Sequence, residues 1–167
     1  MMASGRAWVF GDDIDTDVLA PGAYMKGSIE ELAGHCLESI DPDFAKSVQP
    51  GDVLVAGKNF GVGSSREQAA EALKALGISA IVARSFAGIF YRNAINLGLP
   101  AFASAEAGRV RPGDAVLMDI EAATLTLRQS GTMLNCEPLP GFLLDMIHDG
   151  GLVPHLEKKL KGGRPAA

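Results

Sequence analysis

A glycine-rich loop between an apolar run and a helical pattern is the feature that most restricts how this chain can fold. Residues 57–68 read GKNFGVGSSREQ and follow the apolar run of residues 53–56. Apolar residues then recur at helical spacing, so the sequence predicts a strand, a tight loop and a helix in that order. Ser64 or Ser65 is expected to cap the helix, with an acid or amide three positions on as its reciprocal partner.

Arg66 is the unusual residue of this loop. A cation in the first helical turn opposes the helix dipole, and the free backbone N–H groups there are positive as well. The loop, the helix end and the guanidinium therefore direct positive potential at one small volume, which a carboxylate or phosphate would relieve. The competing interpretation is a capped helix whose Arg66 side chain extends into solvent.

Two nucleotide-binding motifs do not fit the loop. A Walker loop requires a lysine directly before its serine or threonine, and Gly63 precedes Ser64 here. The dinucleotide fingerprint would need a third glycine where Arg66 stands. A serine pair beside an arginine favours an organic acid as the ligand, with one serine in acid–base chemistry and the other groups as clamps.

Composition and charge narrow the class of protein. The chain has 167 residues, enough for one domain with a core, and its 47% hydrophobic content is typical of a folded chain. No apolar run reaches about 18 residues and no secretory signal pattern is apparent, so we expect a cytoplasmic protein without a membrane span. The net charge of −5 argues against nucleic acid as the main partner.

The cysteines and histidines do not form a metal-binding pattern. Cys36 and Cys136 are far apart in the sequence, and His35, His148 and His155 show no close pairwise spacing. Two cysteines fit a reduced cytosolic protein, and they are too few for the usual thiolate set of an iron–sulfur cluster. Any such cluster would have to come from another chain.

The order of the expected elements favours an α/β fold. Residues 53–56 and 80–83 are predicted as buried strands, each followed by a helix, at 65–76 and at 86–97. This alternation predicts parallel pairing with right-handed crossovers. The other expected elements are a strand at 8–10, a loop at 12–24, a short helix at 28–33, a turn at 50–52, a hairpin of strands 116–120 and 124–127 after a turn at 113–114, and a helix at 142–148.

The chain is expected to form a single domain over residues 1–167, because no internal repeat or long linker interrupts it. Its last stretch carries a run of basic side chains, Lys158, Lys159, Lys161 and Arg164. Such a run near a terminus is usually solvated, so residues 157–167 are expected to be a frayed tail rather than a binding patch.

Four aspartates crowd the loop that precedes the first expected helix: Asp12, Asp13, Asp15 and Asp17. Their spacing imitates the start of a calcium loop, but the glycine and the final glutamate that such a loop requires are both missing. Turn and capping hydrogen bonds are expected to employ about two of the four carboxylates. A functional role for one of them stays open.

Three motifs, GDDIDTDVLAPGAYM, GKNFGVGSSREQA and RSFAGIFYRNAINLGLP, resemble in this order the small subunits of 3-isopropylmalate dehydratases and their aconitase-family relatives. The resemblance runs from about residue 8 to residue 100 and continues more weakly over 142–160. It implies the three-layer β/β/α fold of the aconitase swivelling domain. It also implies a hydro-lyase that interconverts 2- and 3-isopropylmalate in leucine biosynthesis by removing and re-adding water.

The resemblance further implies a role for each residue of the motifs. Ser64 matches the family's catalytic base, which acts as an alkoxide. Ser65 and Arg66 match groups that hold a substrate carboxylate, and Asp17 matches an aspartate that orients a histidine of the partner. The [4Fe–4S] cluster would belong to a large subunit, so this chain would carry no metal and would act in a heterodimer or heterotetramer on a small di- or tricarboxylate.

The substrate side chain is less clearly indicated by the sequence. Residues 24–27 read YMKG, where relatives have YLRT if the substrate bears an extra carboxylate and YLVY if it bears an isopropyl group. Lys26 keeps a positive charge without the planar fork of arginine, and it is expected to contact the substrate. Isopropylmalate is favoured because that activity is common in the family; a homoaconitase or another malate-type hydro-lyase is the alternative.

Two interpretations from other functional classes stay open. An anion-binding module without catalysis would bind anions tightly as an isolated chain. A regulatory or scaffold protein on the same fold would not depend on Ser64, since a fold does not determine a function.

Overall fold

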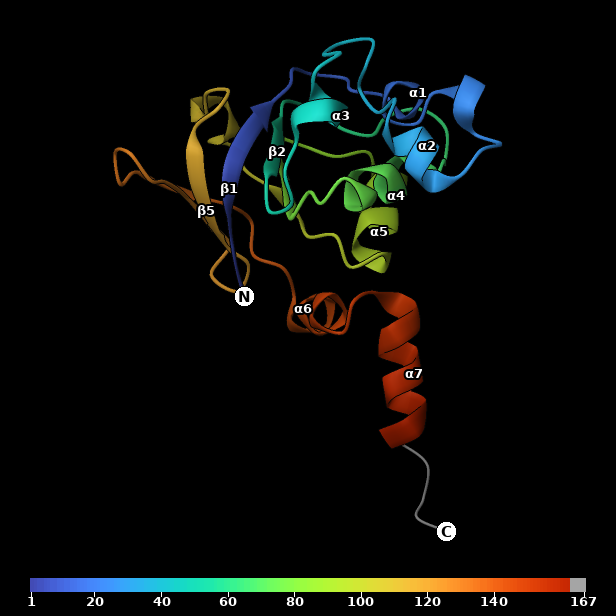
Figure 1. The fold of residues 1–167 in the computed structure, drawn as a ribbon. Helices are drawn as coiled ribbons and strands as arrows, with labels where there is room; N and C mark the ends of the chain where they lie inside the picture. Colours follow the sequence, from blue (N-terminus) through green and yellow to red (C-terminus); the bar gives the residue numbers. More distant parts are fainter. Residues whose placement is uncertain (163–167) are drawn as a thin grey trace.

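The computed structural model describes residues 1–162, and these form a seven-stranded sheet with helices beside it (Figure 1). The strands follow one another across the sheet in the order β4-β3-β2-β1-β5-β6-β7. Their bounds are β1 (Met2–Val9), β2 (Val53–Ala56), β3 (Ala80–Ala83), β4 (Ala101–Ala103), β5 (Ala115–Asp119), β6 (Thr124–Leu127) and β7 (Met133–Asn135).

The first half of the sheet, β1 to β4, is parallel, as the alternation of strands and helices predicts. All residues of β2 and β3 are buried. Their sequences VLVA and AIVA are apolar at every position, because a parallel strand covered on both faces has no solvent side. β4 was missed in the sequence because it has three residues and no distinctive pattern.

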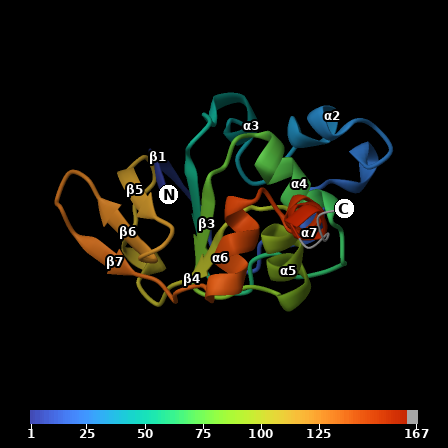
Figure 2. The same cartoon turned by 90° about the horizontal axis from the view of Figure 1, so that it is seen from below.

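The second half, β5 to β7, is antiparallel and joins the first half through β1, which pairs with β2 on one edge and with β5 on the other. This double role explains why β1 is longer than the strand predicted at 8–10. The predicted hairpin is confirmed as β5 and β6. In Figure 2 the parallel strands lie between the antiparallel strands and the helices, which confirms the three-layer β/β/α fold.

The helices largely follow the predicted order, with shifted starts. The predicted helix at 65–76 is α4 (Gln68–Ala75), and the one at 86–97 is α5 (Gly88–Asn96). Ser28 caps α2 (Ile29–Ala33), its Oγ accepting the backbone N–H of Glu31 at 3.1 Å, as predicted. The remaining elements are α1 (Thr16–Leu19), η1 (Gly22–Tyr24), α3 (Phe44–Ser47), η2 (Ala107–Arg109), α6 (Gly141–His148) and α7 (Leu152–Gly162).

The loop after β1 and the loop after β2 run side by side along the same edge of the sheet. Because β1 and β2 are parallel neighbours, their carboxyl ends meet there, which is where α/β sheets commonly bind ligands. Backbone hydrogen bonds join the two loops at four levels, from Gly57 to Gly11, from Asp13 to Lys58, from Gly61 to Ile14 and from Thr16 to Val62. The acidic loop and the glycine-rich loop are therefore one structural unit.

The last helix, α7, extends away from the rest of the molecule, and none of its residues is buried (Figure 1). Of the tail expected to fray, residues 157–162 form the end of α7, and residues 163–167 lie outside the described residues. No helix among residues 1–162 is long and apolar enough to cross a membrane.

Candidate functional site

Two glycines give the β2–α4 loop its path. Gly61 and Gly63 have φ values of +83° and +114°, a backbone region that disfavours residues with a Cβ. A Cβ on Gly61 would overlap the ring of Phe90, and a Cβ on Gly63 would lie 3.1 Å from Oγ1 of Thr16. The glycines therefore bring the loop backbone against α5 on one side and against α1 on the other.

Ser64 and Ser65 are both exposed, and neither caps α4, so the predicted capping box is wrong. The helix begins at Gln68, with Glu67 in the cap position and no side-chain cap. The physical reason is that the backbone bond from Thr16 to Val62 fixes the loop against α1, which holds Ser64 away from the helix axis. Its Oγ instead lies 3.1 Å from Oγ1 of Thr16.

Arg66 lies two residues before α4 rather than in its first turn. Its Nη1 donates a hydrogen bond to the carbonyl oxygen of Ala20 at 3.1 Å and forms an ion pair with Asp17. The Arg66 side chain is 29% exposed and that of Asp17 is 69% exposed. The guanidinium is thus bound to α1 rather than extended into solvent. The Asp17 carboxylate that balances its charge is exposed, so another anion can replace it.

The other three aspartates of the acidic loop have backbone or loop partners. Asp15 caps α1 by accepting the N–H of Val18 at 2.9 Å. Asp12 accepts the N–H of Lys58 at 2.8 Å, and Asp13 accepts the Asn59 side-chain amide at 3.0 Å. Three carboxylates, one more than expected, therefore shape the loops, and Asp17 is the one that faces a cation of the candidate site.

Thr16 is the residue at this site that the sequence did not single out. It is 2% exposed, and its hydroxyl meets that of Ser64. Its place inside the GDDIDTD motif gave no sign of this contact, because the contact depends on how two separate loops pair. The five residues Thr16, Asp17, Ser64, Ser65 and Arg66 are brought together by these loops, and we call them the serine–arginine site.

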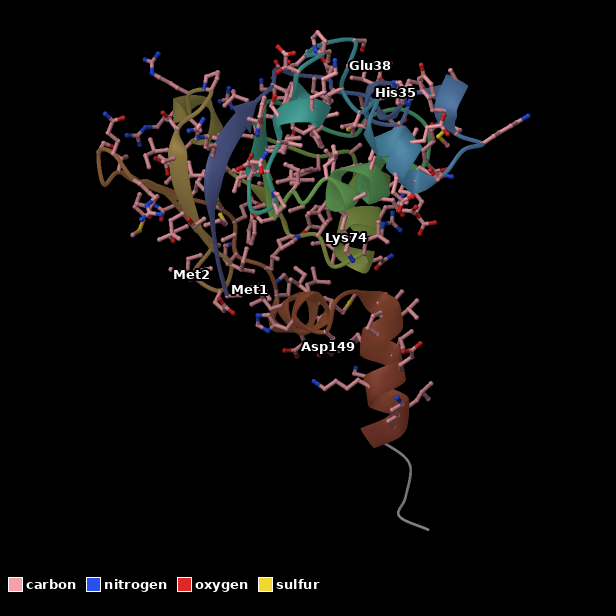
Figure 3. All side chains as sticks on the ribbon, viewed as in Figure 1. Met1, Met2, His35, Glu38, Lys74 and Asp149 are labelled. Carbon is pink, nitrogen blue, oxygen red and sulfur yellow. The ribbon has the colours of Figure 1, made fainter. Side chains whose placement is uncertain are left out.

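Lys26 is exposed and follows η1, and among residues 1–162 it forms no ion pair. The segment around it is held by Tyr24, whose ring stacks on His35 with centroids 3.5 Å apart. His35 in turn contacts Glu38 at 2.7 Å, and both are labelled in Figure 3. The structure records no hydrogen bond or ion pair between Lys26 and the serine–arginine site, so its expected contact with substrate stays a prediction.

A cavity of about 570 Å³ lies elsewhere, between α6 and α7. Its lining mixes acids and bases and includes Asp149, which is labelled in Figure 3. Asp149 accepts hydrogen bonds from His155 at 2.6 Å and from Lys158 at 3.0 Å. Among the described residues no group of three or more His, Cys, Asp or Glu side chains is arranged to hold a metal ion. The cavity belongs to the helix junction rather than to the serine–arginine site.

The serine–arginine site combines two hydroxyls, a cation and the N-terminal end of α4 on an open surface. Such a surface can attract a carboxylate, but water competes for every hydrogen bond while the site stays uncovered. Proton transfer by a serine hydroxyl needs a drier environment than these exposed side chains have. The arrangement therefore has the groups of a carboxylate-binding site but does not exclude water from them.

Comparisons with known proteins agree with this description. Residues 23–105 match the family described as the aconitase C-terminal domain. The chain is 48% identical to the 3-isopropylmalate dehydratase small subunit of Syntrophus aciditrophicus, over 97% of this chain and all of that protein. It is 50% identical to 3-isopropylmalate dehydratase small subunit 1 of Thermotoga maritima, over 94% of this chain and 96% of that one.

A solved structure gives the same result in three dimensions. The crystal structure of a 3-isopropylmalate dehydratase from Methanocaldococcus jannaschii superposes with a TM-score of 0.92 and 44% sequence identity, over 98% of both chains. The likeness therefore includes the antiparallel strands and the C-terminal helices as well as the motifs of the first hundred residues.

Proposed function

The chain belongs to the family of 3-isopropylmalate dehydratase small subunits, and on that premise we propose that its serine–arginine site is the small subunit's half of the active site. The activity of this family is that of a hydro-lyase of the aconitase type. It interconverts 2- and 3-isopropylmalate by loss and return of water, a step of leucine biosynthesis. The chain acts with a large subunit, which we propose forms a heterodimer or heterotetramer with it.

The observation that carries the proposal is the position of Ser64. Its hydroxyl is exposed, lies beside a buried hydroxyl and shares its loop with a cation. Dehydration of a hydroxy acid removes a proton from the carbon next to a carboxylate, and the electron pair of that C–H bond forms the double bond as the hydroxyl leaves. A strong base is needed for such a weak acid, and Ser64 as an alkoxide would take the proton on its Oγ.

The free energy of ionising a serine limits what this chain does alone. Each unit by which a pKa is lowered requires about 1.4 kcal/mol of selective stabilisation. A helix N-terminus contributes at most about 2 kcal/mol. The remainder has to come from Arg66, from exclusion of water when the subunits close, and from the positive charge of the covering site.

Arg66 and Ser65 would hold a carboxylate of the substrate. A guanidinium binds a carboxylate through two parallel hydrogen bonds, whereas the present pairing with Asp17 uses one nitrogen, Nη1. An entering substrate carboxylate would therefore replace Asp17. Once released, Asp17 is free to orient a histidine of the large subunit, the role implied by its place in the motif.

The cysteines of this chain do not suit a cluster. Cys36 is fully buried, and burial raises the pKa of its thiol far above the ordinary value. Burial also raises the pKa of Cys136 to about 11. Both thiols stay protonated near neutral pH and are poor thiolate ligands, which supports placing the [4Fe–4S] cluster in the large subunit. A cluster there would supply a Lewis acid for the departing hydroxyl.

The test is anaerobic co-purification of the chain with a large subunit, followed by assays on isopropylmalate, homoaconitate, citrate and smaller malates. We expect turnover of isopropylmalate by the assembled protein and none by the chain alone. A preference for homoaconitate would show that the substrate is a tricarboxylate rather than isopropylmalate. Hydration by the isolated chain, or a chromophore bound to it, would contradict the two-subunit proposal.

Lys26 is tested in the same assay with Lys26→Val. Should the lysine contact a third carboxylate, loss of its charge leaves that group unpaired at a cost of about 1–3 kcal/mol, and homoaconitate turnover falls. Should the substrate carry an isopropyl group, the change costs little, because no charge then lies beside an apolar group. We expect a rise in the preference for isopropylmalate. Equal effects on both substrates would show that residues 24–27 do not read the substrate side chain.

A further inference from the structure

Thr16 is placed more firmly than any other side chain of the serine–arginine site. It is the first residue of α1, directly after the capping Asp15. Its N–H donates to the carbonyl of Val62 at 2.9 Å, and its own carbonyl accepts the N–H of Ala20 at 2.8 Å. Only 2% of the Thr16 surface is exposed, so contacts within the protein, and not water, determine its position.

The Thr16 hydroxyl has a single recorded side-chain partner among residues 1–162, the hydroxyl of Ser64 at 3.1 Å. A buried hydroxyl without a hydrogen bond is destabilising, and no buried side-chain polar atom in the described part of the chain lacks a partner. Ser64 is exposed and can also bond to water. The contact is therefore obligatory for Thr16 and optional for Ser64, so Thr16 is the fixed member of the pair.

Gly63 makes the contact possible. A Cβ on this residue would lie 3.1 Å from Oγ1 of Thr16, which is tighter than ordinary van der Waals contact. The loop therefore approaches α1 closely at the residue before Ser64. This approach brings the serine oxygen within hydrogen-bond distance of the buried hydroxyl.

We propose that Thr16 is a positioning residue for Ser64, its hydroxyl aiming the Ser64 oxygen and donating a hydrogen bond to it when that oxygen is deprotonated. The inference rests on the proposed role of Ser64 as base. In the neutral pair either oxygen can donate, but an alkoxide can only accept, so the proton of the pair must then belong to Thr16. A hydrogen bond donated to the charged form of a group favours that form and lowers its pKa.

The expected size of the effect follows from the charge on the acceptor. A hydrogen bond to a charged group is about two to three times as stabilising as one between neutral groups. For the Ser64 alkoxide this corresponds to about a 10- to 100-fold change in rate. The same hydrogen bond lowers the pKa of the Ser64 hydroxyl, because it favours the charged form. Substrate binding should change little, because Ser65 and Arg66 hold the carboxylate.

The test uses Thr16→Val, which keeps the shape of the side chain and removes the hydroxyl, in the assembled two-subunit enzyme. We expect kcat to fall by about 10- to 100-fold with KM nearly unchanged, and the rise of kcat with pH to move to higher pH. Thr16→Ser, which restores the hydroxyl, should recover most of the rate. An unchanged kcat and pH profile for Thr16→Val would overturn the proposal, as would failure of Thr16→Ser to recover activity when its thermal stability is that of the wild type.

Ser104→Ala is the matched control. Ser104 is also buried, 3% exposed, and directly follows β4, and its Oγ donates to the carbonyl of Asn135 at the end of β7 at 2.7 Å. Its loss removes a buried hydroxyl of comparable environment outside the serine–arginine site. We expect lower thermal stability and unchanged kcat. A fall in kcat equal to that of Thr16→Val would mean that Thr16 acts through stability alone, and would overturn the proposal.

The double variant Thr16→Val, Ser64→Ala separates this inference from the proposed function. Thr16→Val should have no further effect on the residual rate once Ser64 is replaced, since it acts through that oxygen. Should Ser64→Ala alone keep full activity, both the role of Ser64 and that of Thr16 are wrong. Should Ser64→Ala abolish turnover while Thr16→Val is as active as the wild type, Ser64 remains the base and only the positioning role is wrong.

Discussion

Arg66 is occupied before any substrate arrives, since its guanidinium pairs with Asp17 and donates to the carbonyl of Ala20. The pair with Asp17 is the weaker restraint, because that carboxylate is 69% exposed and surface ion pairs contribute about 1 kcal/mol or less. A substrate carboxylate with bidentate geometry can displace it. The ion pair with Asp17 thus keeps the Arg66 guanidinium in place without preventing a substrate carboxylate from binding to it.

Asp17→Asn should strengthen the binding of small dicarboxylates to the isolated chain. The substitution removes the competing charge and leaves the bond from Arg66 to Ala20 intact, so a gain of about two- to fivefold in affinity for malonate is expected. Nuclear magnetic resonance titration of the Ser65 and Arg66 amides measures it. Glu67→Gln, which removes a nearby exposed charge that is not paired with Arg66, is the control. Equal gains in both variants would show a general charge effect and contradict the specific pairing.

At the scale of single residues, the sequence predicted side chains of the serine–arginine site but not the contacts that hold them in place. Ser64 was correctly placed in the loop, whereas Ser65 and Arg66, predicted in the first turn of the helix, lie in the loop before α4. The capping role of the serines was wrong, since caps depend on where the first helical turn forms, and the contact with α1 delays that turn. Thr16 was missed because its partner lies 48 positions away in the chain.

The glycine-rich loop is the element on which the site depends most. Gly61 lies against the ring of Phe90, which is 2% exposed and packs edge-on against Phe60 with ring centroids 5.1 Å apart. Neither ring can move without disturbing the core. The loop therefore has a single path between β2 and α4, and its serines are presented from a rigid base.

Gly61→Ala should lower the free energy of unfolding by about 2–4 kcal/mol, the sum of backbone strain at positive φ and overpacking against Phe90. Gly113→Ala is a close control, because Gly113 has the same φ of +83° but nothing within 4 Å of an added Cβ. Its cost should be about 1–2 kcal/mol, from strain alone. Chemical denaturation measures both. Equal losses of unfolding free energy in the two variants would show that the Phe90 ring moves to accommodate the added Cβ. The loop would then not be held by packing against it.

The junction of α6 and α7 is held by charge. Hydrogen bonds from His155 and then Lys158 hold the pKa of Asp149 below its ordinary value. A group whose folded-state pKa is lowered stabilises the fold above its unfolded pKa of about 4 and loses that contribution as pH falls through the folded pKa. The contact that holds α7 against α6 should therefore weaken as the pH falls into the acid range.

Asp149→Asn should be less stable than the wild type at pH 6, and the difference should vanish as pH falls from about 5 to about 2. Denaturation at a series of pH values measures the difference. Asp145→Asn is the control, because Asp145 is an exposed residue of α6, the helix that Asp149 follows, and it has no ion pair among residues 1–162. Its difference from the wild type should be small throughout. A constant difference between Asp149→Asn and the wild type across this range would contradict the proposed linkage.

Elements with a strong pattern were predictable from the sequence, whereas short elements and the exposed helix α7 were not. β2 and β3 were predicted residue for residue because they are apolar throughout, and the β5–β6 hairpin because turn residues bound it. β4, β7 and α1 have three or four residues each, too few for periodicity to show. They form because neighbouring strands and loops supply their partners.

At the scale of the whole molecule, the fold presents the serine–arginine site on an open edge of the sheet. The two loops meet at the carboxyl edge of the parallel strands, and the side chains there are largely open to solvent. The three-layer fold was predictable because three motifs identified the family. The exposure of Ser64 and Ser65 was not predictable, because it depends on how two loops from separate parts of the chain pair. A large subunit that covers this edge would exclude water and complete the constellation.

The central claim is that Ser64 is the base of an active site shared between two subunits, and the kcat of Ser64→Ala in the assembled enzyme tests it most directly. Turnover of isopropylmalate should fall by about 10²- to 10⁴-fold, the usual contribution of a general base. The melting temperature should fall by a few degrees, because the buried Thr16 hydroxyl loses its partner. Ser65→Ala should raise KM more than it lowers kcat. Turnover by Ser64→Ala within about threefold of the wild type would contradict the claim.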